Sequence, residues 1–415
     1  MKIGEVDNGV VSAGAEGMRG AEVPAVFRPP PGNPRFPLFD GLRAMAALGV
    51  LLYHSASLSG YTQFGRLGAW TANLNVGVTI FFVISGFLLY RPYIHAQLTG
   101  TAGPNLTRFY RRRLLRIVPA YWVALTLLSI YPGDPATFAD WPRYYLFLQV
   151  YTPSPPHEGL FQAWSLCVEM SFYLLLPLYA FVTARIFRSQ SATARLKLEL
   201  ALLIVLSIIS GLVTHSWSSG ATSPLAQGLP RFMFWFALGM GLALVSAWQQ
   251  QRGSDSRVLN TIARRSGLCW TAALGTFLLL GALTRVPLDG ISFEPDMALV
   301  QWFLCGVIAL LIAVPAVARG PASQLSNRIL SARSIVWLGL VSYGIFLWQM
   351  GPLTVLFDGQ WTTSGRWIVR FGEFALIAAA LTIPLAAISY YVVERPFLRM
   401  KDPSPRGHFS DEGQQ

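Results

Sequence analysis

The chain has 415 residues, of which 53% are apolar and only 13% are charged. An average soluble domain carries about 25% charged residues, so this composition excludes a disordered chain, a collagen-like chain and an ordinary soluble enzyme. The formal net charge of +12 lies at the ends of apolar runs instead of forming a basic patch, which argues against nucleic acid as a partner. The sequence predicts an all-α polytopic membrane protein.

Three regions follow one another along the chain. Residues 1–35 are rich in Gly, Ala, Val and Pro and lack the basic and apolar order of a signal peptide, so we expect a flexible cytosolic N-terminal tail. Residues 36–399 contain the long apolar runs and are expected to form one transmembrane domain. Residues 400–415 are expected to form a short polar C-terminal tail.

A membrane-spanning helix needs about 20 mostly apolar residues. We expect about ten such helices, embedded in membrane lipid. They lie near residues 39–58, 74–92, 117–131, 163–183, 200–214, 232–249, 267–284, 297–318, 334–356 and 372–393. Residues 144–151 are apolar but too short to span, and we expect them at the membrane interface or in a re-entrant segment.

The basic residues predict the orientation of these helices. With the N-terminus inside, 26 of the 32 Lys and Arg residues fall in inside segments. This bias places both termini in the cytoplasm, as expected for a multi-pass protein of the cell membrane. The longest outside loop, residues 132–162, is then the best candidate for a lid or an acceptor-facing element.

The first predicted helix contains two polar residues on one face. Arg43 and His54 are eleven residues apart, which is about three helical turns and roughly 16 Å along the axis. A histidine within a span normally faces a partner or a cavity. His54 is therefore either hydrogen-bonded between helices or a general base facing a tunnel whose entrance Arg43 guards.

The fourth predicted helix begins with Trp164 and contains Glu169, an intramembrane carboxylate at a depth similar to that of His54. Such a carboxylate is a candidate functional residue, and it could accept the imidazole N–H and fix its tautomer. The alternative is a buried structural pair with an arginine. In the second helix, Ser85 and Gly86 are either a site element or only a notch of small residues for helix packing.

A basic run precedes the third helix. Arg113 and Arg116 are three residues apart and share one face of a helix that enters the membrane. Positive-inside orientation explains one or two arginines of this run but explains Arg116, pushed against the apolar segment, less well. Since the guanidinium fork suits phosphate oxygens, a cytosolic nucleotide-bearing co-substrate would dock well here.

No metal site is expected. The cysteines Cys167, Cys269 and Cys305 lie far apart, in or beside apolar runs, and no metal-ligand spacing is present. Small buried apolar residues are the simpler interpretation.

Taken together, these features resemble the membrane-bound acyltransferase-3 family, which O-acylates carbohydrates, lipid-linked saccharides and some macrolides. The resemblance covers about residues 36–399. It rests on the Arg43 to His54 spacing, Phe82-Val83-Ile84-Ser85-Gly86-Phe87-Leu88, Arg113-Leu114-Leu115-Arg116-Ile117-Val118-Pro119, Trp164-Ser165-Leu166 with Glu169, Ser342-Tyr343-Gly344-Ile345 and Glu394-Arg395-Pro396. It implies a ten-helix core and acyl transfer from an acyl-coenzyme A, often acetyl-CoA, to a hydroxyl group.

The resemblance also implies roles for residues. His54 matches the family's essential histidine, Arg113 and Arg116 match its paired arginines on the CoA side, and Glu169 matches an acidic position. With Arg43, the two paired arginines are expected to bind the CoA phosphates. Trp164, Ser85 and Gln349 are expected at the substrate.

One position departs from the family pattern. Many members read Leu-Trp-His after the Ser-Tyr-Gly motif, whereas this chain reads Leu347-Trp348-Gln349. Gln cannot take a proton as imidazole does. The acid–base role that a second histidine could have in acceptor binding is therefore not expected at Gln349. A two-domain transfer scheme with a fused extracellular hydrolase domain, as in some relatives, is not expected.

The hypothesis is direct transfer. His54 removes the proton of the acceptor hydroxyl (on a saccharide, glycolipid or macrolide), Glu169 orients the imidazole, and no acyl-enzyme is needed. A covalent variant through Ser85 is an alternative without a supporting nucleophile motif. Two other classes remain, a small-molecule transporter and a non-catalytic assembly protein. The clustered arginines and the absence of repeats count against the first, and the buried ionisable residues count against the second.

Overall fold

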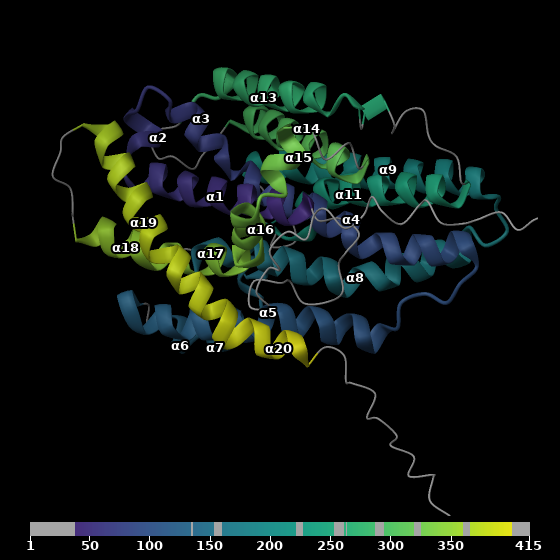
Figure 1. Ribbon diagram of the computed structural model, residues 1–415, viewed down its shortest axis with the longest axis horizontal. Coiled ribbons are helices and arrows are strands. Elements are labelled where there is room, and N and C mark those ends of the chain that lie inside the picture. Colours follow the sequence, from purple (N-terminus) through teal and green to yellow (C-terminus); the bar gives the residue numbers. More distant parts are fainter. Residues whose placement is uncertain are drawn as a thin grey trace, which may run out of the picture.

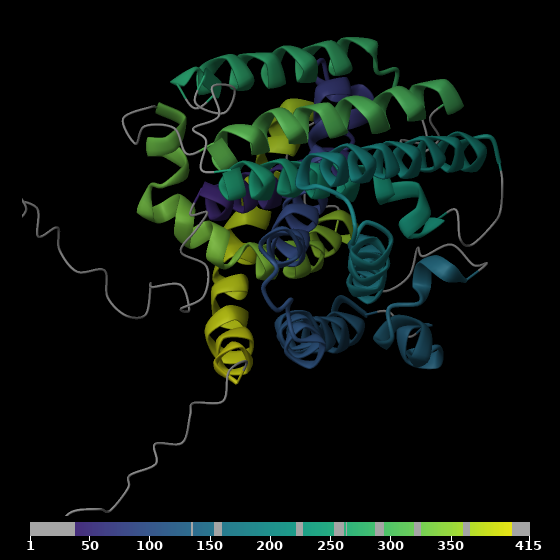
Figure 2. The ribbon, with the colours of Figure 1, turned by 90° about the vertical axis from the view of Figure 1, so that its right-hand side faces the viewer.

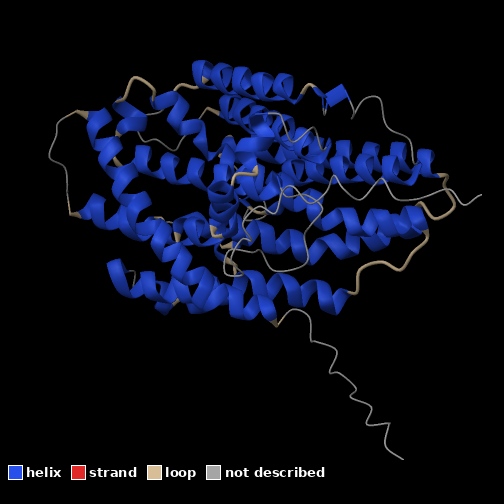
Figure 3. Ribbon diagram, viewed as in Figure 1, coloured by secondary structure: helices blue, strands red, loops and turns tan. Residues whose placement is uncertain are grey.

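The structure is a computed structural model. It describes residues 38–133, 136–152, 160–220, 227–252, 261–262, 264–286, 294–318, 325–359 and 366–400. The expected N-terminal tail and residues 401–415 lie outside these ranges. So do Asp134, His157 and Glu158 of the loop predicted to face the acceptor. Helices make up the ordered elements throughout the described residues, and none of these residues forms a strand (Figure 3).

Figure 1 shows the helices as one elongated bundle. The longest are α1 (Leu38–Leu58), α4 (Val76–Thr99), α5 (Leu106–Leu128), α8 (Trp164–Ile186), α9 (Ala192–Ser218), α11 (Leu229–Arg252), α13 (Ser266–Leu283), α14 (Pro295–Ala318) and α19 (Trp367–Ser389). The shorter ones are α2 (Tyr61–Phe64), α3 (Gly68–Ala72), α6 (Ala136–Ala139), α7 (Trp141–Tyr145), α15 (Leu325–Leu330), α16 (Arg333–Leu340), α17 (Ser342–Trp348), α18 (Met350–Asp358) and α20 (Arg395–Arg399).

All ten predicted segments coincide with helices of this bundle. In the described residues, eight helices are long and apolar enough to cross a membrane, and the bent pair formed by α16 with α17 and α18 brings the number to nine. The tenth segment is α1, which has 21 residues. It is long enough to span, but Asp40, Arg43 and His54 lower its mean hydropathy.

Some helices extend beyond the apolar segments that hydropathy marks. The third predicted segment begins at residue 117, but α5 begins at Leu106, because its first half carries the arginines. Asn105 caps this helix by accepting a hydrogen bond from the backbone N–H of Arg108 at 3.0 Å. Ser191 caps α9 in the same way through Ala194 N at 3.3 Å. The basic run is therefore the first half of α5, as expected for arginines on a helix that enters the membrane.

The predicted interfacial segment is folded as expected for a piece too short to span. Residues 144–151 include the end of α7 and the 3-10 turn Gln149–Tyr151. Leu146 and Leu148 are exposed, whereas Tyr144 is buried. This segment lies beside α5, as Tyr121 Oη donates a hydrogen bond to Tyr144 O at 2.8 Å.

The centre of the bundle is formed by α1 and α4. Figures 1 and 2 show α13 at one edge and α5 at the opposite edge, with α1 and α4 between them. Of the spanning helices, α4 is the most buried. The first turn of α1 is also interior, since Phe39 and Leu42 are completely buried. His54 on α1 and Thr79 on α4 are therefore buried against protein.

Two glycines allow α4 and α11 to cross with their backbones almost in contact. A Cβ built on Gly239 of α11 would lie 2.1 Å from Val83 O of α4. A Cβ built on Gly86 of α4 would lie 2.4 Å from Phe236 O of α11. Such close approach between small residues is a common basis of helix association in membranes. Gly86 is thus the packing notch, and its neighbour Ser85 is left to face a cavity.

We expect Gly239→Ala to destabilise the protein, because its methyl group would collide with the backbone of α4. The expected loss is about 1–3 kcal/mol, the usual cost of overpacking. It is measured as a lower midpoint of thermal unfolding in detergent. Gly275→Ala in α13 is the matched control, since nothing lies within 4 Å of its Cβ position and alanine favours a helix. Equal midpoints of thermal unfolding for Gly239→Ala and Gly275→Ala would show that α4 and α11 do not cross in backbone contact.

A break between α16 and α17 brings a further segment to the centre. The two helices are bent by 55°. Just before the break, a Cβ on Gly339 would lie 1.9 Å from Asp40 O, so α16 crosses the start of α1 in backbone contact. Just after it, Ser342 donates a hydrogen bond to Gly339 O at 2.8 Å. The break therefore places Ser342 and Tyr343 beside α1.

Candidate functional site

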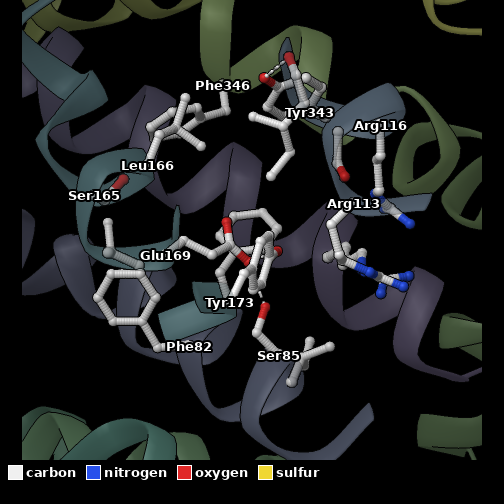
Figure 4. Close-up of a pocket in the computed structure, with 16 residues that line it drawn as sticks. Phe82, Ser85, Arg113, Arg116, Ser165, Leu166, Glu169, Tyr173, Tyr343 and Phe346 are labelled. Atoms are coloured by element: carbon white, nitrogen blue, oxygen red, sulfur yellow. Dashed lines mark hydrogen bonds between the residues drawn. The ribbon is translucent and has the colours of Figure 1, made fainter. Parts of the chain in front are cut away.

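A cavity lies where α1, α4, α5, α8 and α17 meet (Figure 4). It contains about 690 Å³ of space that protein atoms do not fill, part of it open to the outside. Five of the eight predicted site residues line it, which are Arg43, Ser85, Arg113, Arg116 and Glu169. Its apolar lining includes Phe81, Phe82, Ile84, Leu166 and Phe346.

Three guanidinium groups lie close together on this cavity. Arg113 and Arg116 come from one face of α5, as their spacing predicted, and Arg43 comes from α1; each of the α5 pair is near enough to Arg43 to repel it. Arg43 Nη1 forms an ion pair with Asp40 Oδ1 at 2.7 Å. Arg113 Nε is buried and has no hydrogen-bond partner among the described residues. The cavity therefore has donors for an anion.

The carboxylate of Glu169 occupies the middle of the cavity wall (Figure 4). Its Oε1 accepts hydrogen bonds from Ser85 Oγ and from Tyr173 Oη, both at 2.5 Å. The Arg113 guanidinium lies 5.9 Å from the centre of the Tyr173 ring and attracts the carboxylate electrostatically. Glu169 thus ties together α4, α5 and α8.

His54 lies away from this network. The expected hydrogen bond between Glu169 and His54 does not occur in the structure. Instead, the side chain of Gln349 lies next to the imidazole, near enough to interact with it. His54 is 8% exposed and Gln349 is fully buried. Because His54 does not line the cavity, a shared site would need a ligand that extends from the arginines to His54.

Although His54 and Gln349 lie side by side, one buried polar atom of each forms no hydrogen bond of normal geometry among the described residues. Gln349 Nε2 donates to Phe346 O at 3.1 Å, whereas Gln349 Oε1 has no hydrogen bond of normal geometry within the described part of the chain. His54 Nδ1 is also buried and has no hydrogen-bond partner among the described residues. Buried polar atoms of this kind are rare unless a ligand or a water molecule binds them. Phe346 lines the cavity and is one helical turn before Gln349, so the two regions adjoin.

Trp164 is adjacent to the cavity without lining it. Its ring packs 6.4 Å from Phe82, a lining residue, and 4.9 Å from Phe232 of α11. The following residue, Ser165, does line the cavity. Trp164 therefore belongs to an aromatic layer behind the wall.

Sequence reasoning missed two tyrosines of the cavity. Tyr173 is one helical turn after Glu169, and this i, i+4 spacing could have revealed it. Tyr343 lies in the Ser-Tyr-Gly motif, and its hydroxyl donates to Ile117 O of α5 at 2.8 Å. No spacing within α5 or α17 alone could have shown this contact.

The described residues contain no group of three His, Cys, Asp or Glu side chains arranged to hold a metal ion. Cys167 and Cys305 are buried, and Cys269 is partly buried. The chemistry available at the cavity is that of guanidinium groups, one carboxylate, hydroxyls and a nearby imidazole. Such a set suits a ligand with an anionic head and an apolar or acyl-bearing tail.

Comparison with known proteins gives the family. A family model described as an acyltransferase domain (Acyl_transf_3) matches residues 37–392. The chain belongs to the acyltransferase-3 family. The resemblance inferred from the sequence motifs is thereby confirmed, and so is the expectation of an acyltransferase.

Several curated proteins are similar to this chain. Peptidoglycan O-acetyltransferase OatA of Listeria monocytogenes is 28% identical over 389 residues, which cover 87% of this chain and 55% of the relative. O-acetyltransferase OatA of Staphylococcus aureus is 26% identical over 387 residues, covering 88% and 57%. YrhL of Bacillus subtilis is 29% identical over 379 residues, covering 87% and 54%. The chain thus spans about half the length of these relatives, and no solved structure matches it.

Proposed function

We propose that this protein is an O-acyltransferase that moves an acyl group, in the simplest case acetyl, from an acyl-CoA to a hydroxyl of a carbohydrate. The observation that supports this proposal most directly is the cavity with three arginines, one carboxylate and an apolar wall inside a membrane bundle. Charged residues at such a depth are costly and mark functional sites. Family membership supplies the reaction class.

The end of the cavity that carries the arginines suits the phosphate groups of the acyl donor. CoA carries phosphate groups, and Arg43, Arg113 and Arg116 offer forked donors that match phosphate oxygens. The unpaired Arg113 Nε supports the fit. The apolar lining around Phe82 and Phe346 would hold the acyl arm out of water. With the N-terminus in the cytoplasm, the basic first half of α5 lies where a cytosolic donor would arrive.

His54 is proposed as the general base. Its unpaired Nδ1 can accept a hydrogen bond from the acceptor hydroxyl, and Gln349 Oε1 can accept another from the same sugar. His54 takes the hydroxyl proton while the oxygen attacks the thioester carbonyl. The new C–O bond forms, the C–S bond breaks, and the CoA thiolate leaves and is protonated from the imidazolium. Protons and charges balance without an acyl-enzyme.

Glu169 is proposed as a positioning residue. Its carboxylate offsets the mutual repulsion of the arginines and fixes the hydroxyls of Ser85 and Tyr173. Both hydroxyls then present their lone pairs to the cavity. This role replaces the direct contact with His54 that the sequence suggested.

The acceptor is proposed to be a carbohydrate on a cell-envelope glycan or a glycolipid. The names of two relatives, OatA of Listeria monocytogenes and of Staphylococcus aureus, support acetyl transfer, the first of them to peptidoglycan. The comparisons given above lend no support to a macrolide acceptor. We further propose that the protein lies in the cell membrane with both termini in the cytoplasm.

We expect Arg113→Gln and Arg116→Gln to raise KM for acyl-CoA about tenfold or more, because each removes a charge-assisted hydrogen bond worth about 1.5–3 kcal/mol. The measurement is acyl-CoA-dependent release of free CoA by purified protein with a carbohydrate acceptor. Arg111→Gln is the matched control, since Arg111 is on the same helix but is exposed. Unchanged KM values for acyl-CoA in both α5 variants would show that acyl-CoA does not bind in this cavity.

A further inference from the structure

Arg231, near the start of α11, is held between aromatic rings outside the cavity just described. Its Cζ lies 3.7 Å from the centre of the Trp217 ring, at the end of α9, and 5.2 Å from that of Phe232. Cation–π contact uses the face of a guanidinium group, whereas its N–H donors point outward in the plane. These contacts therefore hold the guanidinium group against the two rings without using its N–H donors.

These N–H donors have no partner among the described residues. No hydrogen bond or ion pair from the Arg231 side chain occurs there, and its Nε is buried and unpaired. The backbone at the same residue is firmly held, because Arg231 O accepts hydrogen bonds from Ser210 at 2.7 Å, from Trp302 at 3.0 Å and from Thr214 at 3.3 Å. Three donors on one carbonyl fix the position from which the guanidinium is presented.

The rings beside Arg231 are connected to the cavity by other packed rings. Phe232 lies 4.9 Å from Trp164 and 6.0 Å from Phe82 (ring centres), and Phe82 lines the cavity. Trp164 begins the helix that carries Glu169. An aromatic path thus runs from Arg231 to the wall of the cavity. Phe232 and Phe82 are buried in this path, whereas Trp217 and Trp164 are only partly buried and can offer a face to the axial C–H groups of a sugar ring.

We propose that Arg231 binds an anionic group of the acceptor, so that the acceptor is an acidic saccharide bearing a carboxylate or a phosphate. This inference rests on the proposed function. The fork of Arg231 would hold the anion, the partly buried Trp217 would pack against the sugar ring next to it, and the hydroxyl to be acylated would reach toward the cavity. The same fork could bind the phosphate of a membrane lipid, and the test separates these two sources.

The test uses two acceptors with the same hydroxyls and different charge. One is the disaccharide of N-acetylglucosamine and N-acetylmuramic acid, and the other is its methyl ester. The protein is purified in a polyoxyethylene detergent that has neither phosphate nor sugar. For Arg231→Gln we expect KM for the acid to rise about tenfold or more, while KM for the ester and kcat stay near those of the wild type. Arg231→Lys should keep part of the preference.

Arg370→Gln is the matched control, since Arg370 also lies over a ring, that of Phe374, at 5.6 Å. It should leave the preference for the acid unchanged. If wild type uses acid and ester equally, or if Arg231→Gln impairs both acceptors alike, the inference is overturned. If the effect of Arg231→Gln occurs only when anionic phospholipid is added back, the ligand is a lipid headgroup and the inference is again overturned.

Equilibrium binding of the labelled disaccharides, measured without acyl-CoA, separates this inference from the proposed reaction. Preference of the wild type for the acid, lost in Arg231→Gln, supports the site even if no acyl transfer occurs. Equal binding of acid and ester by the wild type overturns it even if transfer proceeds.

Discussion

Replacing His54 by glutamine is expected to reduce acyl transfer by about 10²- to 10⁴-fold, the usual contribution of a general base. Glutamine keeps much of the volume and polarity of the imidazole but cannot take a proton at neutral pH. The loss should fall on kcat, because the arginines that bind the donor are unaffected. The measurement is label transfer from acetyl-CoA to saccharide acceptors by purified protein, with thermal unfolding as a check of folding.

His215→Gln serves as the control for the His54 variant, since His215 is exposed in the last turn of α9. It should retain full activity. A His54→Gln protein that unfolds at the wild-type temperature and transfers acetyl at the wild-type rate would contradict the assigned role. An intermediate loss that disappears at higher pH would instead indicate that another group accepts the proton.

Replacing Glu169 by glutamine is expected to lower kcat/KM by about two orders of magnitude. The amide keeps the shape of the side chain, but it leaves the arginines of the cavity without their central counter-charge. It also weakens the hydrogen bonds from Ser85 and Tyr173, because bonds to a charged acceptor are roughly twice as strong as neutral ones. Rates over a range of acyl-CoA concentrations would separate the effect on donor binding from the effect on kcat.

Ser85→Ala and Tyr173→Phe each remove one of the two hydrogen bonds to Glu169 and should cost less than Glu169→Gln does. If either variant lost as much activity as Glu169→Gln, its hydroxyl would act on the substrate and not through the carboxylate. If all three variants retained wild-type kinetics, the network would be structural only.

The bundle was predictable because long apolar runs leave a chain few alternatives in a membrane. All ten segments were found, including α1, whose polar residues interrupt its run. The ends were less predictable, since a helix that leaves the lipid can continue through polar residues, as α5 does from Leu106. The 55° break between α16 and α17 also had no clear signal, because both halves are apolar.

The candidate site was predictable within helices and not between them. Arg113 and Arg116 share a face because of their spacing, and both line the cavity. The partner of Glu169 depends on how α8 is shifted along α1 and α4, and hydropathy does not fix such a shift to within one turn. As a result, the carboxylate that was expected beside His54 lies beside Ser85 instead, and Gln349 lies beside His54.

The crossing of α4 and α11 through Gly86 and Gly239 also bears on the length of the acyl group. Phe81, Phe82, Ile84 and Ser85 all belong to α4, whose backbone is seated against that of α11 and cannot retreat. A wall that cannot move limits the length of the acyl group that fits against it. Each further methylene of a longer acyl chain would have to displace side chains instead of sliding the helix, and such a fit discriminates by about 1–3 kcal/mol per methylene. If the acyl group lies against this wall as proposed, we expect the two glycines to favour short donors, although neither of them lines the cavity.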